Sequence, residues 1–239
     1  MIENAGIALV TGANKGIGYQ IAAQLAGRGM TVLLGARDEQ AREKAAAELG
    51  VHPLALDVTD PASARTAAAS IEERFGRLDV LVNNAGITGG RAQAPSSADL
   101  DVLRAVFEVN VLGVLTVTNA MLPLLRRSTA ARIVNMSSGV GSLALLSDPA
   151  GPFAQMGASA AYVPSKTALN SLTVQYAKEL RSAGILVNLA DPGHVATDLT
   201  GFTGSRTPAQ GAAIAVRLAT LGADGPTGGY FNEDGPLPW

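Results

Sequence analysis

The sequence predicts an α/β fold, in which helices cover both faces of a single doubly wound parallel sheet. Short apolar runs recur along the chain, as strands that are buried on both faces require. Helical patterns of roughly 10–15 residues separate these runs, and such alternation is typical of parallel βαβ units. The chain has 239 residues, 47% hydrophobic and 16% charged, with no linker, composition shift or internal repeat. We therefore expect residues 1–239 to form one domain with a sheet of about seven strands.

The strands are expected where the apolar runs lie. The first, at residues 7–10, leads into a glycine-rich turn at 11–18, after which a helical pattern continues to about residue 29. Further strands are expected at residues 31–35, 53–56, 79–82, 132–136, 185–190 and near 230–231. Small and polar residues follow the carboxyl ends of these strands, which is the edge where such sheets bind ligands.

The helices are predicted from the residues that begin and end them. Asp38 is expected to open a helix that runs to Leu49, as an acid near the helix N-terminus. Pro61 lies in the first turn of the next helix, which Gly76 ends. The remaining helices are expected from about residue 97 to 125, from 162 to about 181, and after Thr207 and Pro208.

The composition argues against several classes of function. A net charge of −2 without a basic block disfavours binding to nucleic acid. The absence of cysteine excludes disulfides and thiol chemistry, and two histidines, His52 and His194, make a poor basis for a metal site. No signal peptide is visible at the N-terminus, and the apolar run at 109–125 is too polar to span a membrane. We expect a cytoplasmic protein with no metal, no nucleic-acid partner and no membrane association.

The glycine-rich turn indicates a nucleotide site. Gly12, Gly16 and Gly18 lie between a predicted strand and a predicted helix, with the spacing G-x-x-x-G-x-G rather than G-x-G-x-x-G. Glycines at such a junction let the backbone turn tightly and approach a pyrophosphate, which then rests on the helix N-terminus. A tight turn without a ligand is the weaker interpretation, because three glycines fall within one short segment. We therefore predict a dinucleotide-binding site.

The end of the second strand indicates which dinucleotide is bound. A site for NAD usually places a carboxylate about 20 residues past the glycines, where it binds the ribose 2′-hydroxyl. This chain has Ala36 and Arg37 at that place, and Lys15 lies within the glycine-rich turn. Two cations suit a 2′-phosphate, so the sequence favours NADP(H). The alternative for Arg37 is a solvated loop charge.

Tyr162 and Lys166 are candidate catalytic residues. They are four positions apart in a predicted helix, so their side chains share one face. A tyrosine keeps its proton to a pKa of about 10. A nearby cation favours the phenolate, and we expect Lys166 to lower the pKa of Tyr162 toward neutral, where the hydroxyl can act as acid or base. Alone, the pair is a weak signal, because any helix can carry it by chance.

The chain resembles the short-chain dehydrogenase/reductase family over nearly its whole length. In the family's order and spacing it carries Thr11-Gly12-x-x-x-Gly16-x-Gly18, Asn83-Asn84-Ala85-Gly86, Asn110, Ser138, Tyr162-x-x-x-Lys166 and Pro192-Gly193. The glycine-rich turn and Arg37-Asp38 are most similar to those of NADPH-dependent carbonyl reductases. The resemblance implies a Rossmann-like fold and reversible hydride transfer between NADP(H) and a ketone or aldehyde.

The resemblance implies four catalytic residues. Tyr162 would give a proton to the ketone oxygen, or remove it from an alcohol in the reverse direction. Lys166 would lower the pKa of that tyrosine and bind the nicotinamide ribose, and Ser138 would hydrogen-bond the substrate oxygen. Asn110 would hold a water that connects Lys166 to solvent. For Asn110 the alternative is a buried amide satisfied by backbone groups.

The resemblance also implies the residues that hold the cofactor. Asp57 and Val58 would meet the adenine, whereas the segment after Pro192 would hold the nicotinamide. In full, the expected contacts are Gly12, Asn14, Lys15, Gly16, Ile17, Gly18, Arg37, Asp57, Val58, Asn84, Ala85, Gly86, Tyr162, Lys166, Pro192, Gly193, Val195 and Thr197. Asn83 is expected to tie neighbouring strands together.

Two loops are expected to shape the substrate pocket. The interval between Ser138 and Tyr162 is longer than in the simplest family members, which places an insert at about residues 143–157. Because catalytic residues flank it, the insert must overhang the pocket. A second loop at 194–206 is expected to form the opposite wall and to close as a lid. Apolar residues in both loops predict a hydrophobic ketone or aldehyde.

Two other functions stay open. A 3-oxoacyl-carrier-protein reductase of the same family needs a basic surface for its acidic carrier, and Arg126-Arg127 is the paired basic site in the relevant half. A non-catalytic NADP-sensing protein would not be expected to keep the four catalytic residues. We expect a homodimer or homotetramer, although the insert is compatible with a monomer. The segment 228–239 is expected to pack on the body or on a neighbouring subunit, with a frayed tail as the alternative.

Overall fold

A computed structural model describes residues 6–90 and 93–239. In this part of the chain, seven parallel strands form one sheet in the order β3-β2-β1-β4-β5-β6-β7. The strands are β1 (Ile7–Thr11), β2 (Thr31–Ala36), β3 (His52–Ala55), β4 (Val80–Asn83), β5 (Arg132–Met136), β6 (Leu186–Ala190) and β7 (Tyr230–Phe231). The predicted parallel sheet is therefore confirmed. Its strand order reverses between β1 and β4, and such a switch point opens a crevice at the carboxyl ends of the strands.

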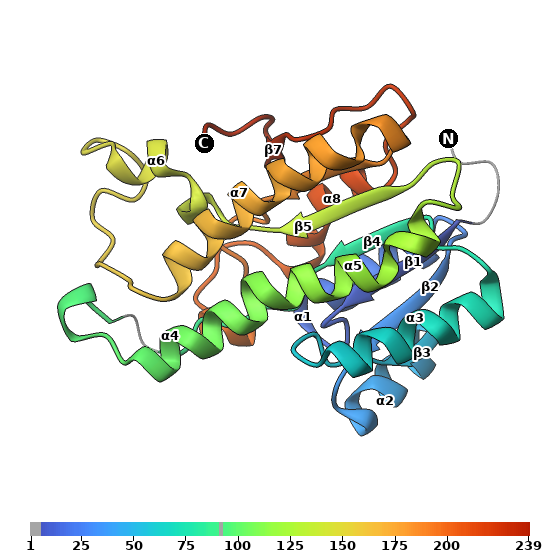
Figure 1. Ribbon diagram of the computed structural model, residues 1–239. Helices are drawn as coiled ribbons and strands as arrows, with labels where there is room; N and C mark the ends of the chain where they lie inside the picture. The colour runs from blue at the N-terminus through green and yellow to red at the C-terminus, as the bar shows by residue number, and fades with distance from the viewer. Residues whose placement is uncertain (1–5, 91–92) are drawn as a thin grey trace.

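Helices cover both faces of the sheet (Figure 1). One core contains the buried side chains of α1 (Gly16–Ala26), α2 (Glu39–Leu49) and α8 (Pro208–Ala219). The other core contains those of α3 (Pro61–Phe75), α5 (Gly113–Leu125) and α7 (Tyr162–Leu180). Alternate strand residues supply the two cores, because successive side chains of a strand point to opposite faces. Among the described residues, no helix has both the length and the apolarity to cross a membrane.

The predicted helix signals act at the positions where the structure begins or ends its helices. The Asp38 carboxylate caps α2 by accepting from the Ala41 N–H at 2.7 Å. Thr207 and Gln210 form a reciprocal capping box at the start of α8. Gly76 ends α3 with a φ of 74°, in the left-handed region that favours glycine. These local contacts fix where each helix meets the sheet edge.

The helix predicted from about residue 97 to 125 is wrong in one respect, because the structure divides it. A 3₁₀ turn, Pro95–Ser97, precedes α4 (Leu100–Phe107), and a π-helical turn, Glu108–Leu112, joins α4 to α5. Apolar periodicity cannot reveal a wider turn, because the flanking helices keep their own pattern. The π-helical turn carries Asn110, one of the predicted catalytic residues.

The C-terminal segment packs on the body of its own chain, so the frayed alternative is wrong. The Leu237 N–H donates to the Tyr230 carbonyl oxygen at 2.8 Å, and the Tyr230 and Trp239 ring centroids are 5.9 Å apart. The Trp239 carbonyl oxygen accepts from the Ala144 N–H at 2.8 Å, at the start of α6 (Leu143–Ser147). The segment thus braces the helix that opens the predicted insert.

Candidate active site

The turns that follow β1 and β4 are bound to each other through Thr11. Its hydroxyl oxygen accepts from the N–H groups of Asn84 and Ala85, both at 3.0 Å. The Asn84 amide donates in return to the carbonyl oxygens of Thr11 at 2.9 Å and Gly12 at 3.2 Å. Thr11 was not among the predicted site residues, although its place directly before the first glycine was a usable signal. The two halves of the predicted dinucleotide site are therefore one hydrogen-bonded unit.

The glycine-rich turn has the shape that a pyrophosphate requires. Gly12 and Gly16 have φ values of 62° and 61°, and a side chain on Gly12 would meet the Ala85 Cα at 2.9 Å. Lys15 stands at the N-cap of α1, where the structure records no side-chain capping bond. The first N–H groups of α1 consequently keep room for an anion at the helix N-terminus. These residues fit a dinucleotide.

The two predicted phosphate-binding cations lie at the open side of this turn. The Lys15 and Arg37 side chains are 68% and 70% exposed, and each faces a carboxylate. The Lys15 Nζ lies 2.5 Å from Asp198 Oδ2, and an Arg37 Nη1 lies 3.9 Å from Asp57 Oδ2. Asp38 is occupied as the cap of α2. The carboxylate nearest Arg37 therefore comes from β3's carboxyl end, and Asp38 does not compete for a ribose.

Some predicted cofactor residues face the core with their side chains. Val58 is buried against Gly113, and Val195 is buried against Gly211. Their backbone groups are consequently what they offer to a ligand. Thr197 lies beside the glycine-rich turn, since its Cγ2 is 3.5 Å from the point where a Gly16 Cβ would stand. The 194–206 loop therefore lies next to the glycine-rich turn.

A buried ladder of polar side chains supports the site from below. The Asn83 amide nitrogen donates to Thr118 Oγ1 at 3.0 Å and to Asn135 Oδ1 at 2.8 Å. The Asn135 amide nitrogen then donates to Thr173 Oγ1 at 2.8 Å. This confirms that Asn83 ties neighbouring strands, and it extends the ladder to α5 and α7. The carboxyl ends of β4 and β5 are thereby fixed relative to α7, which carries the predicted catalytic pair.

Ser138, Tyr162 and Lys166 come together beyond the carboxyl end of β5. Tyr162 begins α7, and its phenol lies close enough to the Ser138 side chain for Ser138 to lower its pKa. The buried Lys166 ammonium donates to the Met136 carbonyl oxygen at 2.8 Å and lies 5.6 Å from the Tyr162 ring centroid. Burial lowers the pKa of Lys166 to about 8. The cluster of Ser138, Tyr162 and Lys166 can therefore hydrogen-bond a substrate oxygen and exchange a proton with it.

The expected lowering of the Tyr162 pKa is wrong for this structure. Burial raises the pKa of Tyr162 to about 12, the Ser138 hydrogen bond lowers it, and the charge of Asp191 raises it. The Lys166 ammonium is held on Met136, next to the ring rather than on the phenol oxygen. Helical spacing indicated that the two side chains share a face, but it could not show how deeply the phenol is buried.

Asn110 is buried, and its amide bridges two elements of the site. Its Oδ1 accepts from the Ile87 N–H at 2.9 Å, and its Nδ2 donates to the Ile87 carbonyl oxygen at 2.9 Å. The same nitrogen donates to Ser165 Oγ at 3.0 Å, on α7. The side chain is therefore satisfied by backbone and by Ser165, as the alternative interpretation supposed. Asn110 Oδ1 and Lys166 Nζ lie 3.4 and 3.8 Å from the point where a Gly86 Cβ would stand, so both side chains reach the same glycine. The water that would connect Lys166 to solvent through Asn110 stays a prediction.

The insert contains a short helix and encloses a cavity. Helix α6 opens it, and the chain returns to α7 through a loop whose Ala160 N–H donates to the Gln93 carbonyl oxygen at 3.0 Å. A cavity of about 250 Å³ lies between the insert and the first turn of α7. Its apolar lining comes from Leu146, Pro149, Phe153, Met156 and Val163. Phe153 also packs on Gly139, directly after Ser138.

The fold and this cluster define the class of protein: a Rossmann-like α/β protein with a dinucleotide turn and a Ser–Tyr–Lys group at the carboxyl edge of its sheet. A family model described as short chain dehydrogenase matches residues 6–207. The chain therefore belongs to the short-chain dehydrogenase/reductase family, whose members are oxidoreductases that use nicotinamide cofactors.

Named relatives agree with this assignment. The chain is 38% identical to "Short-chain dehydrogenase anuI" of Penicillium roqueforti, covering 91% of this chain and 89% of the relative. It is 33% identical to the (-)-isopiperitenone reductase of Mentha piperita, covering 99% of each chain. The solved structure of an NADPH-bound carbonyl reductase from chicken fatty liver superposes with a TM-score of 0.86, at 31% identity, over 98% of this chain and 99% of that one.

Proposed function

We propose that the protein is an NADPH-dependent carbonyl reductase that converts a hydrophobic ketone or aldehyde to an alcohol, with Tyr162 as the proton donor. The observation that carries this proposal is that Ser138, Tyr162 and the buried Lys166 lie together at the sheet edge where the dinucleotide turn opens. The reductases among its relatives and structural neighbours support the proposal.

The residues have a division of labour in this reaction. When bound, the nicotinamide supplies the hydride to the carbonyl carbon. The Ser138 hydroxyl donates a hydrogen bond to the carbonyl oxygen and stabilises the charge that develops there. Tyr162 gives its proton to the same oxygen, and Lys166 holds the nicotinamide ribose. With a pKa of about 12, the Tyr162 phenol is protonated at neutral pH, which suits a proton donor and supports the reductive direction.

The preference for NADPH over NADH rests on charge. Lys15 and Arg37 are both exposed at the open side of the glycine-rich turn, where a 2′-phosphate would lie. The carboxylate that could bind a free 2′-hydroxyl, Asp38, is used to cap α2. A guanidinium binds a phosphate with two parallel hydrogen bonds, so Arg37 is the main determinant that we propose.

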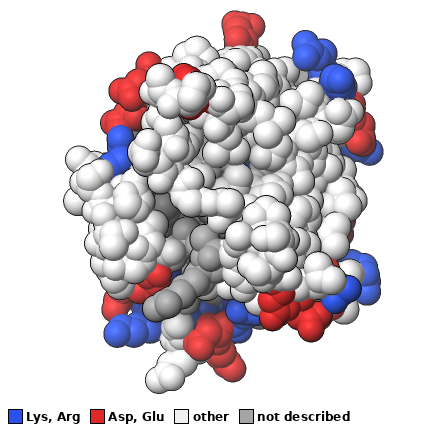
Figure 2. Space-filling model, turned by 90° about the vertical axis from the view of Figure 1, so that its left-hand side faces the viewer, with Lys and Arg blue, Asp and Glu red and all other residues white. Residues whose placement is uncertain are grey.

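The preference for a hydrophobic substrate rests on the walls of the site. The cavity under the insert has apolar side chains such as Leu146, Phe153 and Met156 in its lining, beside the polar Ser147, Asp148 and Ser159. Leu199 and Phe202 of the opposite loop are exposed. The face formed by the insert and α4 is largely uncharged, with charged side chains gathered at its margin (Figure 2). Such walls favour an apolar carbonyl compound over a small charged one.

The 3-oxoacyl-carrier-protein reductase alternative finds no support in the position of the basic pair. Arg126 and Arg127 follow α5, and the chain then enters β5 at its amino end. They therefore lie at the edge of the sheet opposite to Ser138 and Tyr162. Each faces a carboxylate, at 3.8 Å on Glu179 and 2.6 Å on Glu72. A carrier protein that docked there could not deliver its thioester to the site.

The test is NADPH oxidation by the purified protein against a panel of aryl and alkyl ketones, aldehydes and small charged carbonyl compounds. We expect turnover of apolar carbonyl compounds, lost in Tyr162→Phe with the affinity for NADPH within about threefold of wild type. Turnover confined to small charged substrates would contradict the hydrophobic assignment. Tight NADPH binding without turnover of any panel member would instead favour a non-catalytic NADP-sensing protein.

The predicted assembly stays open to measurement. A homodimer or homotetramer is the expectation for a chain of this family length, and the insert is compatible with a monomer. Light scattering coupled to size-exclusion chromatography distinguishes these states directly.

A further inference from the structure

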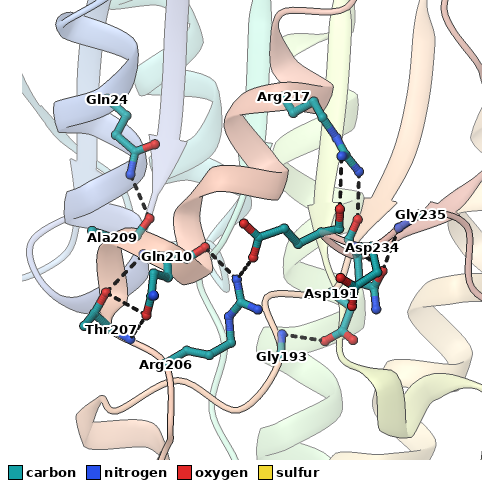
Figure 3. A network of polar contacts seen from close by, with 12 residues as sticks. Gln24, Asp191, Gly193, Arg206, Thr207, Ala209, Gln210, Arg217, Asp234 and Gly235 are labelled. Carbon is teal, nitrogen blue, oxygen red and sulfur yellow. Dashed lines mark hydrogen bonds and ion pairs between the residues drawn. The ribbon is translucent and has the colours of Figure 1, made fainter.

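Asp191 lies between the two segments that would have to meet around the reacting carbonyl. It follows β6 and precedes Pro192-Gly193, the turn predicted to hold the nicotinamide. Its side chain is buried, and Oδ1 accepts from the Gly193 N–H at 3.0 Å (Figure 3). The backbone of Gly139, directly after Ser138, lies beside this carboxylate and lowers its pKa. One carboxylate therefore joins the turn after β6 to the segment that carries Ser138.

The fit around Gly139 leaves no freedom for this contact to shift. Asp191 Oδ2 lies 3.2 Å from the point where a Gly139 Cβ would stand, and the Phe153 ring lies 3.0 Å from the same point. The carboxylate thus occupies the space beside a glycine that the insert covers from the other side. A change in the Asp191 side chain is consequently transmitted to the backbone next to Ser138.

Arg206 supplies the opposite charge. Its Cδ lies 2.9 Å from the point where a Gly193 Cβ would stand, and its charge lowers the pKa of Asp191, although burial raises that pKa overall. Within residues 6–90 and 93–239, Arg206 Nε is the buried side-chain nitrogen without a hydrogen-bond partner. Its Nη2 donates to the Gln210 carbonyl oxygen at 3.2 Å and pairs with Glu233 (Figure 3). The guanidinium is therefore fixed over the Asp191 turn.

The backbone of Arg206 has a separate role at the base of the 194–206 loop. The Ala196 N–H donates to the Arg206 carbonyl oxygen at 2.8 Å, and the Arg206 N–H donates to the His194 carbonyl oxygen at 3.1 Å. The loop thus closes on itself at the residue whose side chain lies over Asp191. A substitution of Arg206 that keeps these backbone bonds removes the charge together with the side-chain contacts to Gln210 and Glu233.

Two tyrosines face the same carboxylate. The charge of Asp191 raises the pKa values of Tyr162 on α7 and Tyr230 on β7. The Tyr230 hydroxyl donates to the Ser138 carbonyl oxygen, so it too contacts the segment that Asp191 holds. Within the described part of the chain, the ionisable groups coupled to Asp191 are therefore these two phenols and Arg206, whose partner is Glu233.

We propose that Asp191, with Arg206 as its counter-charge, is a positioning residue that holds Ser138-Gly139 against the Pro192-Gly193 turn. It thereby sets the distance between the groups that bind the carbonyl oxygen and the turn that receives the nicotinamide. The inference rests on the proposed reductase function. It assigns to Asp191 no contact with substrate, because Oδ1 accepts from the Gly193 N–H and Oδ2 packs against Gly139.

Asp191→Asn is the primary test, because it keeps the shape and removes one acceptor. An asparagine can accept from one N–H, but its own NH₂ then faces the other. We expect kcat for ketone reduction to fall about 10- to 100-fold, with KM for ketone and Kd for NADPH within about threefold. In alcohol oxidation, the pH at which kcat/KM levels off should move down by about half a unit, since a negative charge near Tyr162 is lost.

Arg206→Gln tests the counter-charge and leaves the Gly193 N–H bond to Asp191 in place. Without the guanidinium, the pKa of Asp191 rises, so the carboxylate takes up a proton at higher pH and loses an acceptor. The acid limb of the kcat profile should therefore shift to higher pH by about one unit relative to wild type. The matched control is Asp234→Asn, an exposed carboxylate beside Glu233 that contacts neither segment, and it should keep the wild-type profile.

Hydrogen exchange at the Gly139 and Gly193 amides gives a readout that needs no turnover. Faster exchange at both amides in Asp191→Asn, and not in Asp234→Asn, supports the positioning role. If the wild type reduces no ketone, the proposed function is wrong, but this exchange result still supports the positioning role. Unchanged exchange at these amides in Asp191→Asn would overturn the role of Asp191. The role would also be overturned if the wild type reduces ketones and both Asp191→Asn and Arg206→Gln keep its kcat and its pH profile. A poorly folded Asp191→Asn leaves Arg206→Gln to decide between these outcomes.

Discussion

Lys15 in the glycine-rich turn and Asp198 in the 194–206 loop form an ion pair, with 2.5 Å between Nζ and Oδ2. The pair joins residues 183 positions apart in the chain, so it links the loop to the turn that would receive the phosphates. Both side chains are more than half exposed, and such a pair contributes little to stability. Its importance is that a bound phosphate and Asp198 compete for the same ammonium.

The first prediction follows from this competition. Asp198→Asn should strengthen NADPH binding about two- to fivefold at low ionic strength. In this variant Lys15 can bind the phosphate without first breaking an ion pair with a carboxylate. The gain in affinity should shrink in 0.5 M salt, because the Debye length there is roughly 4 Å and exposed charges are screened. Fluorescence titration gives the Kd values. Asp224→Asn removes an equal charge at an exposed position elsewhere, and a matching gain in that variant would contradict a local effect.

The second prediction concerns Arg37. Arg37→Ala should weaken NADPH binding about 10- to 100-fold and change the Kd for NADH less than threefold, because a 2′-phosphate loses its guanidinium partner whereas a 2′-hydroxyl does not. Arg65→Ala on α3 controls for net charge. Equal weakening of both cofactors would refute the 2′-phosphate assignment.

The sequence predicted the sheet and the edge at which the site lies, for a physical reason. Buried parallel strands are short apolar runs, and the chain must turn at their carboxyl ends, so Gly12, Asn84, Ser138 and Pro192 could be placed by position alone. Capping residues such as Asp38 acted through contacts three residues away, which sequence also reveals. Local chemistry was therefore predictable wherever its partners were close in the chain.

What the sequence could not predict depends on partners far apart in the chain. The raised pKa of Tyr162 comes from burial by the surrounding elements, and the Lys15–Asp198 pair and the Arg206 contact with Gly193 exist only in the folded protein. The π-helical turn likewise places Asn110 where its side chain hydrogen-bonds Ile87, 23 positions earlier in the chain. Such features require the coordinates, because no periodicity encodes them.

The third prediction is a pH dependence of stability that Lys166 causes. Its pKa is about 8 in the folded protein and 10.5 in its ordinary state, so between these values the unfolded chain holds the proton and the folded one has released it. Stability therefore rises with pH from about 8 to about 10.5 and levels off below 8, where both states hold the proton. Between pH 8 and 9, below the range where the tyrosines of the unfolded chain titrate, the gain should be about 1 kcal/mol.

Urea unfolding of Lys166→Met at several pH values checks this assignment. The variant should lack the rise between pH 8 and 9, because the titrating group is gone. Lys178→Met, an exposed lysine of the same helix, should keep the wild-type slope. A Lys166→Met protein with an unaltered slope would show that another group titrates in this window.

The last prediction concerns the Asn110 amide nitrogen, which donates to the Ile87 carbonyl oxygen and to Ser165 Oγ. Asn110→Asp keeps an oxygen for the Ile87 N–H, but it places a second oxygen against the Ile87 carbonyl and Ser165 in a buried site. We expect a loss of about 3 kcal/mol in the free energy of unfolding at neutral pH, from a buried charge facing an acceptor. The loss should diminish toward acid pH, where a protonated carboxyl can donate to that carbonyl.

Asn119→Asp is the matched control for this change. Asn119 is exposed on α5, and its Oδ1 accepts from the Tyr176 hydroxyl at 2.8 Å, a role that a carboxylate keeps. Its free energy of unfolding should stay within about 0.5 kcal/mol of wild type at every pH. Denaturant titrations of both variants at pH 5 and 7 decide the matter. If Asn110→Asp were no less stable than Asn119→Asp, the π-helical turn would not depend on the bridge from Asn110 to Ile87 and Ser165. Asn110 would then be free for a role in proton transfer alone.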